Sequence, residues 1–181
     1  TTQRQIAAVA AKNHGHSVHN SLAQYRAALS IDEVMAAPGV IWPLTLPMCA
    51  PISDGAAAAV LCSGEAMRRL DCARSVGVLS TQMTTGVGRA GADFDRHLAA
   101  LAAQRAYDEA GIGPEDISVA EVHDATAFAE IQQIENLGFC EFGQGGWITE
   151  RGQTALGGRV PVNPSGGLES KGHPIGATGL G

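Results

Sequence analysis

Apolar positions along the chain follow two kinds of spacing, and each predicts a different element. Residues 94–110 repeat apolar side chains every three or four positions, which predicts an amphipathic helix that Gly111 ends as a C-cap. Ile6 and its neighbours predict a second helix, which begins after Thr2. Further helices are expected after the capping box Ser30–Glu33, after Ser63 and over 125–137, the last with Phe128, Ile131 and Ile134 on one face.

Short runs without polar interruption indicate buried strands. Gly55–Cys62 is small and apolar throughout, which suits a strand covered on both faces, although its alanines also allow a helix. Val76–Leu79 and Ile117–Val122 are the other predicted strands. Strands that alternate with helices predict a parallel sheet with helices packed on it, so the expected fold class is α/β.

Two segments are rich in turn residues. Residues 12–20 (KNHGHSVHN) are polar and are predicted to form a loop. Residues 138–181 are dominated by Gly, Pro, Ser and Asn, and a compact domain favours a functional loop system over disorder there.

Composition restricts the classes of molecule that the protein could bind and the compartment in which it is expected. Only 17% of the residues are charged and 23 are glycines, which indicates a well-buried α/β protein that hides part of its surface in an oligomer. The net charge of −6 and the presence of only two lysines exclude a nucleic-acid binder. No signal sequence or membrane-spanning run is found, and the four cysteines form no C-x-x-C pair, so a cytoplasmic protein with reduced thiols is expected.

Histidines mark the candidate chemistry. His14, His16 and His19 could present imidazoles to a metal, but no cysteine or carboxylate completes a ligand set nearby, so a solvated loop is the preferred interpretation and no metal site is predicted. His123 follows a predicted strand, at the sheet edge where ligands bind in α/β folds. The adjacent Asp124 suits the N-cap of the next helix.

The third cluster is the segment Asn163–Gly179, NPSGGLESKGHPIGATG. Gly166, Gly167 and Gly172 allow the backbone to approach a ligand or a neighbouring element closely. Pro174 fixes the chain just after His173, and a histidine held at such a bend can serve as a general base or activate a thiol. Asn163 and Ser165 are assigned to turn geometry rather than to chemistry.

The segments NPSGG and SKGHPIGATG resemble the C-terminal signature of thiolases, especially the sterol carrier protein type. PLTLPMCAPISDGAAAAVL and EVHDATAFAEIQQIENLGF resemble the same subgroup in the same order, so the resemblance covers nearly the whole chain. It implies a layered αβαβα thiolase-like fold in partial form. Residues 1–72 would be the end of the N-terminal half with loop-domain material, and residues 73–181 most of the C-terminal half without its last strands.

The same resemblance implies acyl transfer between CoA and a 3-oxoacyl-CoA in lipid metabolism, by a protein that is at least dimeric. His173 would activate a nucleophilic thiol, and His123 would support the oxyanion of the thioester carbonyl. Gly166, Gly167 and Gly172 would shape the pocket for CoA, which is a substrate, and no further cofactor is implied. Neither a membrane nor a nucleic acid is expected as a partner, whereas a partner subunit is.

The chain departs from the family pattern in three places. Ala125 stands where the subgroup has a cysteine, and Ala50 stands where a serine often contacts the CoA arm. None of the four cysteines matches the nucleophile, so the chain is interpreted as a fragment without it. Two alternatives stay open: a thiolase-fold retro-aldolase, whose relatives tend to carry tyrosines at 123 and 173, and a non-catalytic module that binds CoA-linked lipids or a partner subunit.

Overall fold

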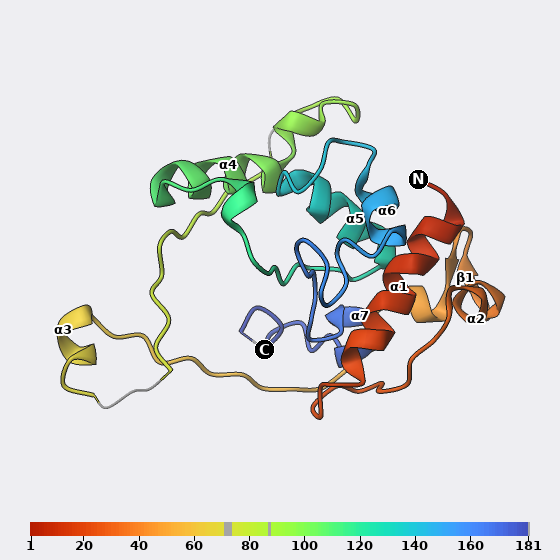
Figure 1. The fold of residues 1–181 in the computed structure, drawn as a ribbon, viewed down its shortest axis with the longest axis horizontal. Coiled ribbons are helices and arrows are strands. Elements are labelled where there is room, and N and C mark those ends of the chain that lie inside the picture. The colour runs from red at the N-terminus through yellow and green to blue at the C-terminus, as the bar shows by residue number, and fades with distance from the viewer. Residues whose placement is uncertain (71–73, 87, 181) are drawn as a thin grey trace.

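Helix α1 (Gln3–Ser17) lies at the centre of the folded body in the computed structural model, which describes residues 1–70, 74–86 and 88–180 (Figure 1). Thr2 caps the helix as the sequence predicts: its hydroxyl accepts the Gln5 N–H at 3.2 Å, and the Gln5 side chain accepts the Thr2 N–H at 2.9 Å. Ile6, Val9 and Ala10 are buried. Four other helices pack against α1: α2 (Ile31–Ala36), α5 (Ala127–Asn136), α6 (Gly145–Glu150) and α7 (Gly167–Lys171).

Apart from the 13-residue helix α4, the remaining elements are short. In the described residues, each strand and each 3-10 turn has three residues or fewer, so helices provide most of the regular structure. These elements are β1 (Gly39–Ile41), β2 (Leu44–Thr45), η1 (Leu46–Met48), α3 (Gly64–Met67), η2 (Phe94–Arg96), α4 (Leu98–Ala110) and η3 (Pro114–Asp116).

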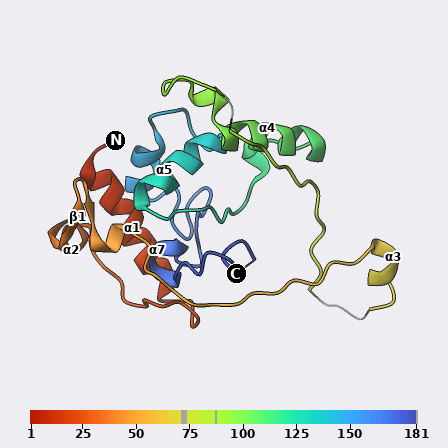
Figure 2. The same ribbon diagram turned by 180° about the vertical axis from the view of Figure 1, so that it is seen from behind.

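The hydrophobic core has two parts. One lies between α1, α2 and α5 and includes Val9, Val34 and Ile131. The other gathers Ile134 of α5 with Phe139, Val160 and Val162. Helix α5 therefore contributes residues to both parts of the core. Figure 2, seen from behind, shows α5 between α1 and α4.

Several predicted helices are confirmed. Ser30 and Glu33 form the expected capping box at α2, Ser63 caps α3, and Gly111 ends α4 in the left-handed conformation at φ 69°. The predicted face of α5 is partly wrong, since Ile131 and Ile134 are buried but Phe128 is half exposed. The turn-rich segment 138–181 contains α6 and α7 within its loops.

The loop predicted over residues 12–20 is wrong in its first part, because α1 continues to Ser17. Polarity there does not mean exposure: His14, His16 and Ser17 are all buried. The Ser17 hydroxyl donates to the His14 carbonyl at 2.9 Å, and His16 bonds across to the loop at Asn163. Tertiary contacts thus satisfy polar side chains that the pattern alone assigns to solvent.

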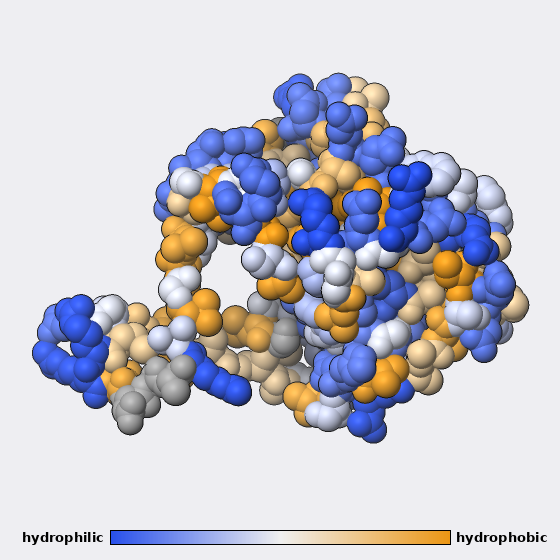
Figure 3. Space-filling view, in the orientation of Figure 1, coloured by the Kyte–Doolittle hydropathy of each residue, from blue (hydrophilic) through white to orange (hydrophobic). Residues whose placement is uncertain are grey.

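The predicted strands Gly55–Cys62 and Val76–Leu79 are also wrong as strands in this structure. Both segments are extended, but the described residues provide neither of them with a ladder partner, and a strand needs one. They form the two sides of an arm that leaves the body, carries α3 near its tip and returns to α4 (Figure 1). Val60 is 92% exposed and Val76 is 91% exposed, and apolar atoms are visible along the arm in Figure 3.

Ile117–Val122 is likewise not a regular strand. It makes one parallel bridge, Ala120 with Val162, through the Ala120 N–H to Pro161 O at 3.0 Å and the Asn163 N–H to Ala120 O at 2.8 Å. Among the described residues, the predicted parallel sheet is thus present only as this bridge and a second one, Ile52 with His173. The proposed boundary between residues 72 and 73 lies outside the described residues. In the described part of the chain, no helix is long and apolar enough to cross a membrane.

Candidate active site at two facing histidines

His123 and His173, separated by 50 positions in the sequence, face each other in the structure. Their ring centroids are 4.9 Å apart and the ring planes are inclined by 80°. His123 follows the Ala120–Val162 bridge by three residues, and His173 follows the C-cap Gly172 of α7. The two rings therefore meet edge to face.

His173 is held by its backbone and by one ring nitrogen. The His173 N–H donates to Ser53 Oγ at 3.1 Å, and Ile52 forms a parallel bridge with the same residue. His173 Nδ1 lies 2.9 Å from Thr178 Oγ1, and that hydroxyl donates its proton to Pro174 O at 3.1 Å. A hydroxyl has one proton, so Thr178 must accept from His173 Nδ1–H. The neutral ring therefore carries its free lone pair on Nε2.

The environment favours that neutral form. Burial lowers the pKa of His173, and the neighbouring His123 lowers it further. A histidine with a lowered pKa stays unprotonated at neutral pH, with a lone pair ready to accept a proton. Geometry and electrostatics together make His173 Nε2 a suitable general base.

One cavity is lined by His123, and a second is lined by the residues on either side of His173. The smaller, of about 200 Å³, is lined by His123, Glu121, Leu168 and Thr178 among others. The larger, of about 430 Å³, lies between residues 53–57, Gly172, Pro174 and the 20–24 segment. Lys171 and Thr178 line both, so the two cavities adjoin along this loop. Together they provide a place for a reacting group beside His123 and for a longer chain beside Gly172.

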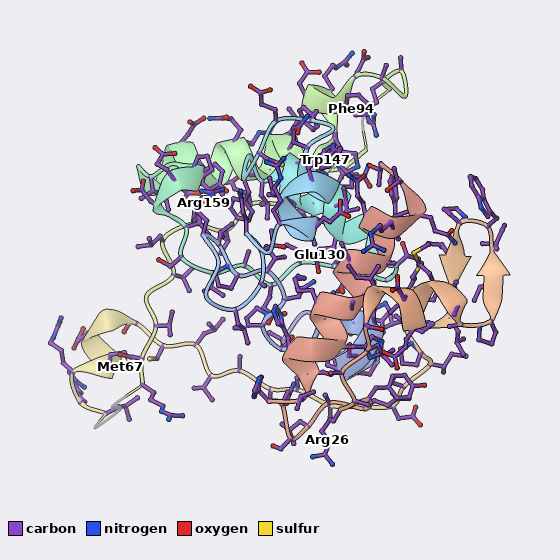
Figure 4. All side chains as sticks on the ribbon, turned by 45° about the vertical axis from the view of Figure 1, so that its right-hand side comes forward. Arg26, Met67, Phe94, Glu130, Trp147 and Arg159 are labelled. Carbon is purple, nitrogen blue, oxygen red and sulfur yellow. The ribbon has the colours of Figure 1, made fainter. Side chains whose placement is uncertain are left out.

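A buried polar network lies beneath the histidines. Lys12 Nζ donates to Glu130 Oε1 at 2.6 Å and to Val162 O at 2.7 Å. Asn13 Nδ2 donates to Glu130 Oε2 at 2.9 Å and to Asp124 Oδ2 at 3.1 Å, and Glu169 Oε2 lies 3.5 Å from it. All three carboxyl groups are at most 1% exposed. Figure 4 shows Glu130 at the centre of the body.

This network sets three buried carboxyl groups against one ammonium. Burial raises the pKa of Asp124 well above its usual value, and the charge of Glu130 raises it further. Burial and then Asp124 raise the pKa of Glu169 in the same way. The cation that acts on both carboxyls is Lys12, which lowers both pKa values.

Asp124 is not the N-cap of α5, so that prediction is wrong. Thr126 takes the N-cap position, and Asp124 Oδ1 accepts the Leu168 N–H of α7 at 2.8 Å instead.

Asn163 does more than shape a turn. At φ 53° its Oδ1 accepts the Val122 N–H and its Nδ2 donates to Glu130, both at 2.8 Å. The sequence signal that could have revealed these residues is the placement of Lys12, Asn13 and Glu130 next to core positions of their helices.

The three glycines predicted to bind a cofactor lie close to other atoms of the protein. A Cβ on Gly166 would come within 2.6 Å of Ser17 Cβ, and one on Gly167 would overlap Asp124 Oδ2. Both have positive φ, 107° and 63°. Gly172 faces Ser53 Oγ and also lines the larger cavity. The close approach to a neighbouring element is thus observed for Gly166 and Gly167, and their role toward a ligand stays a prediction.

Gly167→Ala is expected to lower the free energy of unfolding by about 3 kcal/mol, because it adds left-handed strain and a clash with a buried carboxyl. Gly111→Ala has the same positive φ with open space around it and should cost about 1 kcal/mol. Gly176→Ala has neither and should be near neutral. Urea denaturation measures all three, and equal losses for Gly111 and Gly167 would contradict the clash.

The histidines of the first cluster have structural partners. His16 Nδ1 donates to Asn163 O at 3.0 Å, and its Nε2 accepts the Leu156 N–H at 3.1 Å, so neither nitrogen is left for a metal. His14 stacks on Tyr25 at 6.3 Å, and burial lowers its pKa. His19 is exposed rather than part of a cluster. Within residues 1–70, 74–86 and 88–180, no group of three or more metal-binding side chains is found.

Two described cysteines lack the environment of a nucleophile. Burial raises the pKa of Cys49, and it raises that of Cys140 to about 11. A nucleophilic cysteine needs a lowered pKa. Cys62 is exposed on the arm, and Cys72 lies outside the described residues.

Comparison with known proteins identifies the family. The family model for "Thiolase C-terminal domain-like" proteins matches residues 80–180, more than half of the chain. The chain belongs to this family. Its fold is therefore a partial thiolase-like α/β fold, as the resemblance predicts.

Individual relatives agree with this thiolase assignment. Over 99% of its length, the chain is 40% identical to "Sterol carrier protein 2" of Bos taurus and 38% identical to "Acetyl-CoA acetyltransferase" of Methanothermobacter thermautotrophicus. It is 37% identical over 98% of its length to "Benzoylsuccinyl-CoA thiolase subunit BbsB" of Thauera aromatica. The matches span 34%, 48% and 47% of those proteins, so the chain corresponds to a third to a half of each.

A solved structure shows the same fold. The chain superposes on one chain of an "Ltp2-ChsH2(DUF35) aldolase" with a TM-score of 0.81 at 23% identity. The match covers 99% of this chain and 49% of that one.

Proposed function

We propose that this chain supplies the general base and the oxyanion-binding groups of an acyl-CoA thiolase, which transfers an acyl group between CoA and a 3-oxoacyl-CoA. The observation that carries the proposal is the His123–His173 pair, with its rings 4.9 Å apart and the lone pair of His173 on Nε2. Family membership and the acyltransferase and thiolase names of two relatives support it.

In the proposed reaction, His173 Nε2 takes the proton of a thiol. The thiolate attacks the ketone carbon C3 of the 3-oxoacyl-CoA, while His123 and the His173 imidazolium donate hydrogen bonds to the thioester carbonyl oxygen. Collapse of the tetrahedral intermediate breaks the C2–C3 bond, the thioester oxygen takes the resulting enolate charge, and C2 takes the proton held by the His173 imidazolium. The thiol of CoA then attacks the acyl thioester, which releases acyl-CoA and the first thiol. Donors placed at a developing oxyanion typically contribute about 3 to 4 kcal/mol each.

Neither Cys49 nor Cys140 suits the role of this thiol, since both pKa values are raised. We propose that the thiol comes from a segment or subunit outside these 181 residues. The exposed apolar side chains of the arm, such as Val60, Leu61 and Val76, support a homodimer or higher oligomer or a partner subunit that covers them. CoA would enter as a substrate along the larger cavity beside Gly172.

Infrared difference spectroscopy of bound acetoacetyl-CoA, ¹³C-labelled at the thioester or the ketone carbonyl, tests the proposal. The chain should shift a carbonyl band to lower frequency, because donors polarise the bond. His123→Ala and His173→Ala should each reduce the shift, while His19→Ala, an exposed histidine away from the pair, should leave it unchanged.

Two outcomes would contradict the proposal. Binding without a band shift would favour the non-catalytic CoA-binding module. Retro-aldol cleavage of a 3-hydroxyacyl-CoA by the protein, without thiolysis of a 3-oxoacyl-CoA, would favour the aldolase.

A further inference from the structure

The buried network beneath the site makes direct contact with both histidine-bearing segments. Asp124 is the residue next to His123, and its Oδ1 accepts the Leu168 N–H of α7, five residues before His173. This carboxyl is fully buried, so the bond is shielded from water. One side chain therefore connects the chain end that carries His123 with the helix that leads to His173.

Asn163 makes a second connection between the same segments. Its Oδ1 accepts the Val122 N–H, one residue before His123, at 2.8 Å, and its own N–H donates to Ala120 O at 2.8 Å. Asn163 is fully buried and stands at the start of the loop that leads to α7. With Asp124 it brackets His123, one contact before it and one after.

We propose that Asp124 and Asn163 are positioning residues that hold the His123 segment against the α7–His173 segment, at the spacing at which the two imidazoles face each other. The spacing itself is a property of this chain, and its use in acyl transfer rests on the proposed function. The Ala120–Val162 bridge is the only ladder contact that the described residues of 117–124 make. The side chains of Asp124 and Asn163 therefore supply hydrogen bonds between the two segments that a full sheet would supply through its backbone.

The hydrogen bonds of Asp124 fit this role. Its Oδ1 accepts the Leu168 N–H of α7 and its Oδ2 accepts an N–H from the Asn13 side chain, so both carboxyl oxygens are bonded inside the protein. An amide can do the same, since it offers an oxygen to the Leu168 N–H and carries no charge. Asp124→Asn is therefore the conservative variant, and Asp124→Leu is the variant that removes the acceptor.

Proton NMR of the histidine rings tests the proposal on the 181-residue chain. In the wild type, nuclear Overhauser contacts should connect the His123 and His173 rings, and His173 should titrate below 6.5. Asp124→Leu and, independently, Asn163→Gly should weaken the ring contacts at least threefold and move the His173 titration upward. Asp124→Asn should retain both wild-type signals. Glycine suits the positive φ of position 163, so this variant keeps the backbone conformation.

Glu169→Gln is the matched control. It alters a carboxyl of the same network, but the hydrogen bond of Glu169 is a long one, 3.5 Å to Asn13, and among the described residues Glu169 makes no direct hydrogen bond to the His123 segment. It should change the free energy of unfolding and leave the ring contacts unchanged. If Asp124→Leu does not fold, the Asn163→Gly variant alone tests the positioning role.

Unchanged ring contacts in a folded Asp124→Leu or Asn163→Gly variant would overturn the positioning role, as would equal loss in Glu169→Gln. These outcomes do not depend on a substrate. A carbonyl band that fails to shift in the wild type, together with separated rings in the variants, would refute the proposed function and leave the positioning role intact.

Discussion

Replacement of Lys12 by Met should lower the free energy of unfolding by about 3–5 kcal/mol, because it removes one partner of a buried ion pair. Lys12 is 5% exposed and Glu130 is fully buried, so water cannot replace the lost ammonium. The Val162 carbonyl also loses its donor. Urea denaturation followed by circular dichroism measures the loss.

Two variants separate this effect from lost packing. Lys12→Met combined with Glu130→Gln removes both charges and should recover more than half of the loss. Arg4→Met removes a half-exposed cation that pairs with Asp32 and Glu150, which are 89% and 28% exposed, and should change the free energy of unfolding by less than about 1 kcal/mol. A Lys12→Met variant as stable as Arg4→Met would show that the buried pair contributes nothing.

The Lys12→Met loss should depend on pH in a defined direction. Lys12 lowers the pKa of Asp124 and Glu169, which burial already raises above 3.8 and 4.5. A group whose folded pKa is raised contributes stability below its unfolded pKa and loses it as the pH rises through the folded pKa. Removal of Lys12 raises both folded pKa values further, so the penalty should be smallest near pH 4 and grow toward neutral pH. A penalty that grows toward acid would contradict the assignment.

Replacement of His173 should have the largest effect on activity, measured as the rate of thiol–thioester exchange. The chain is expected to accelerate the transfer of the acyl group from acetoacetyl-CoA to N-acetylcysteamine, because a base and oxyanion donors act even on a thiol supplied in solution. His173→Ala should lower the rate by a factor on the order of 10²–10⁴, the usual contribution of a general base. His123→Ala should lower it by about 10²–10³. Release of CoA, followed by chromatography, measures the exchange.

The pH profile identifies the base. The pKa of His173 is lowered, so its ring stays neutral somewhat below pH 6.5. The exchange rate of the wild type should therefore stay constant as the pH falls, until the ring is protonated. In His173→Ala the reaction needs free thiolate, so the rate should rise roughly tenfold per pH unit between pH 6 and 8. His19→Ala should retain the wild-type profile. Identical profiles for wild type and His173→Ala would exclude His173 as the base.

Local signals in the sequence are enough to predict the helix ends and the site segments. Thr2 and Ser30 cap helices with side chains three residues away, and Gly111 ends α4 through its own backbone freedom, so each needs no distant partner. The NPSGG and GHP motifs mark the His173 loop, and the polar residues after Val122 mark His123. Residue types thus indicate which side chains form the candidate site.

Only the tertiary structure decided which of these segments hydrogen-bond to one another. The extended segments 55–62 and 76–79 have the composition of strands, but a strand exists only where another chain segment accepts its hydrogen bonds, and that partner is not encoded locally. Polar residues of α1 are buried because Asp124, Glu130 and Asn163 arrive from more than 100 positions away to bond with them or beside them. The sequence by itself determined the starts of α1, α2 and α3, the end of α4 and the two imidazoles of the candidate site. Long-range burial determined the hydrogen bonds beneath them and the 4.9 Å between their rings.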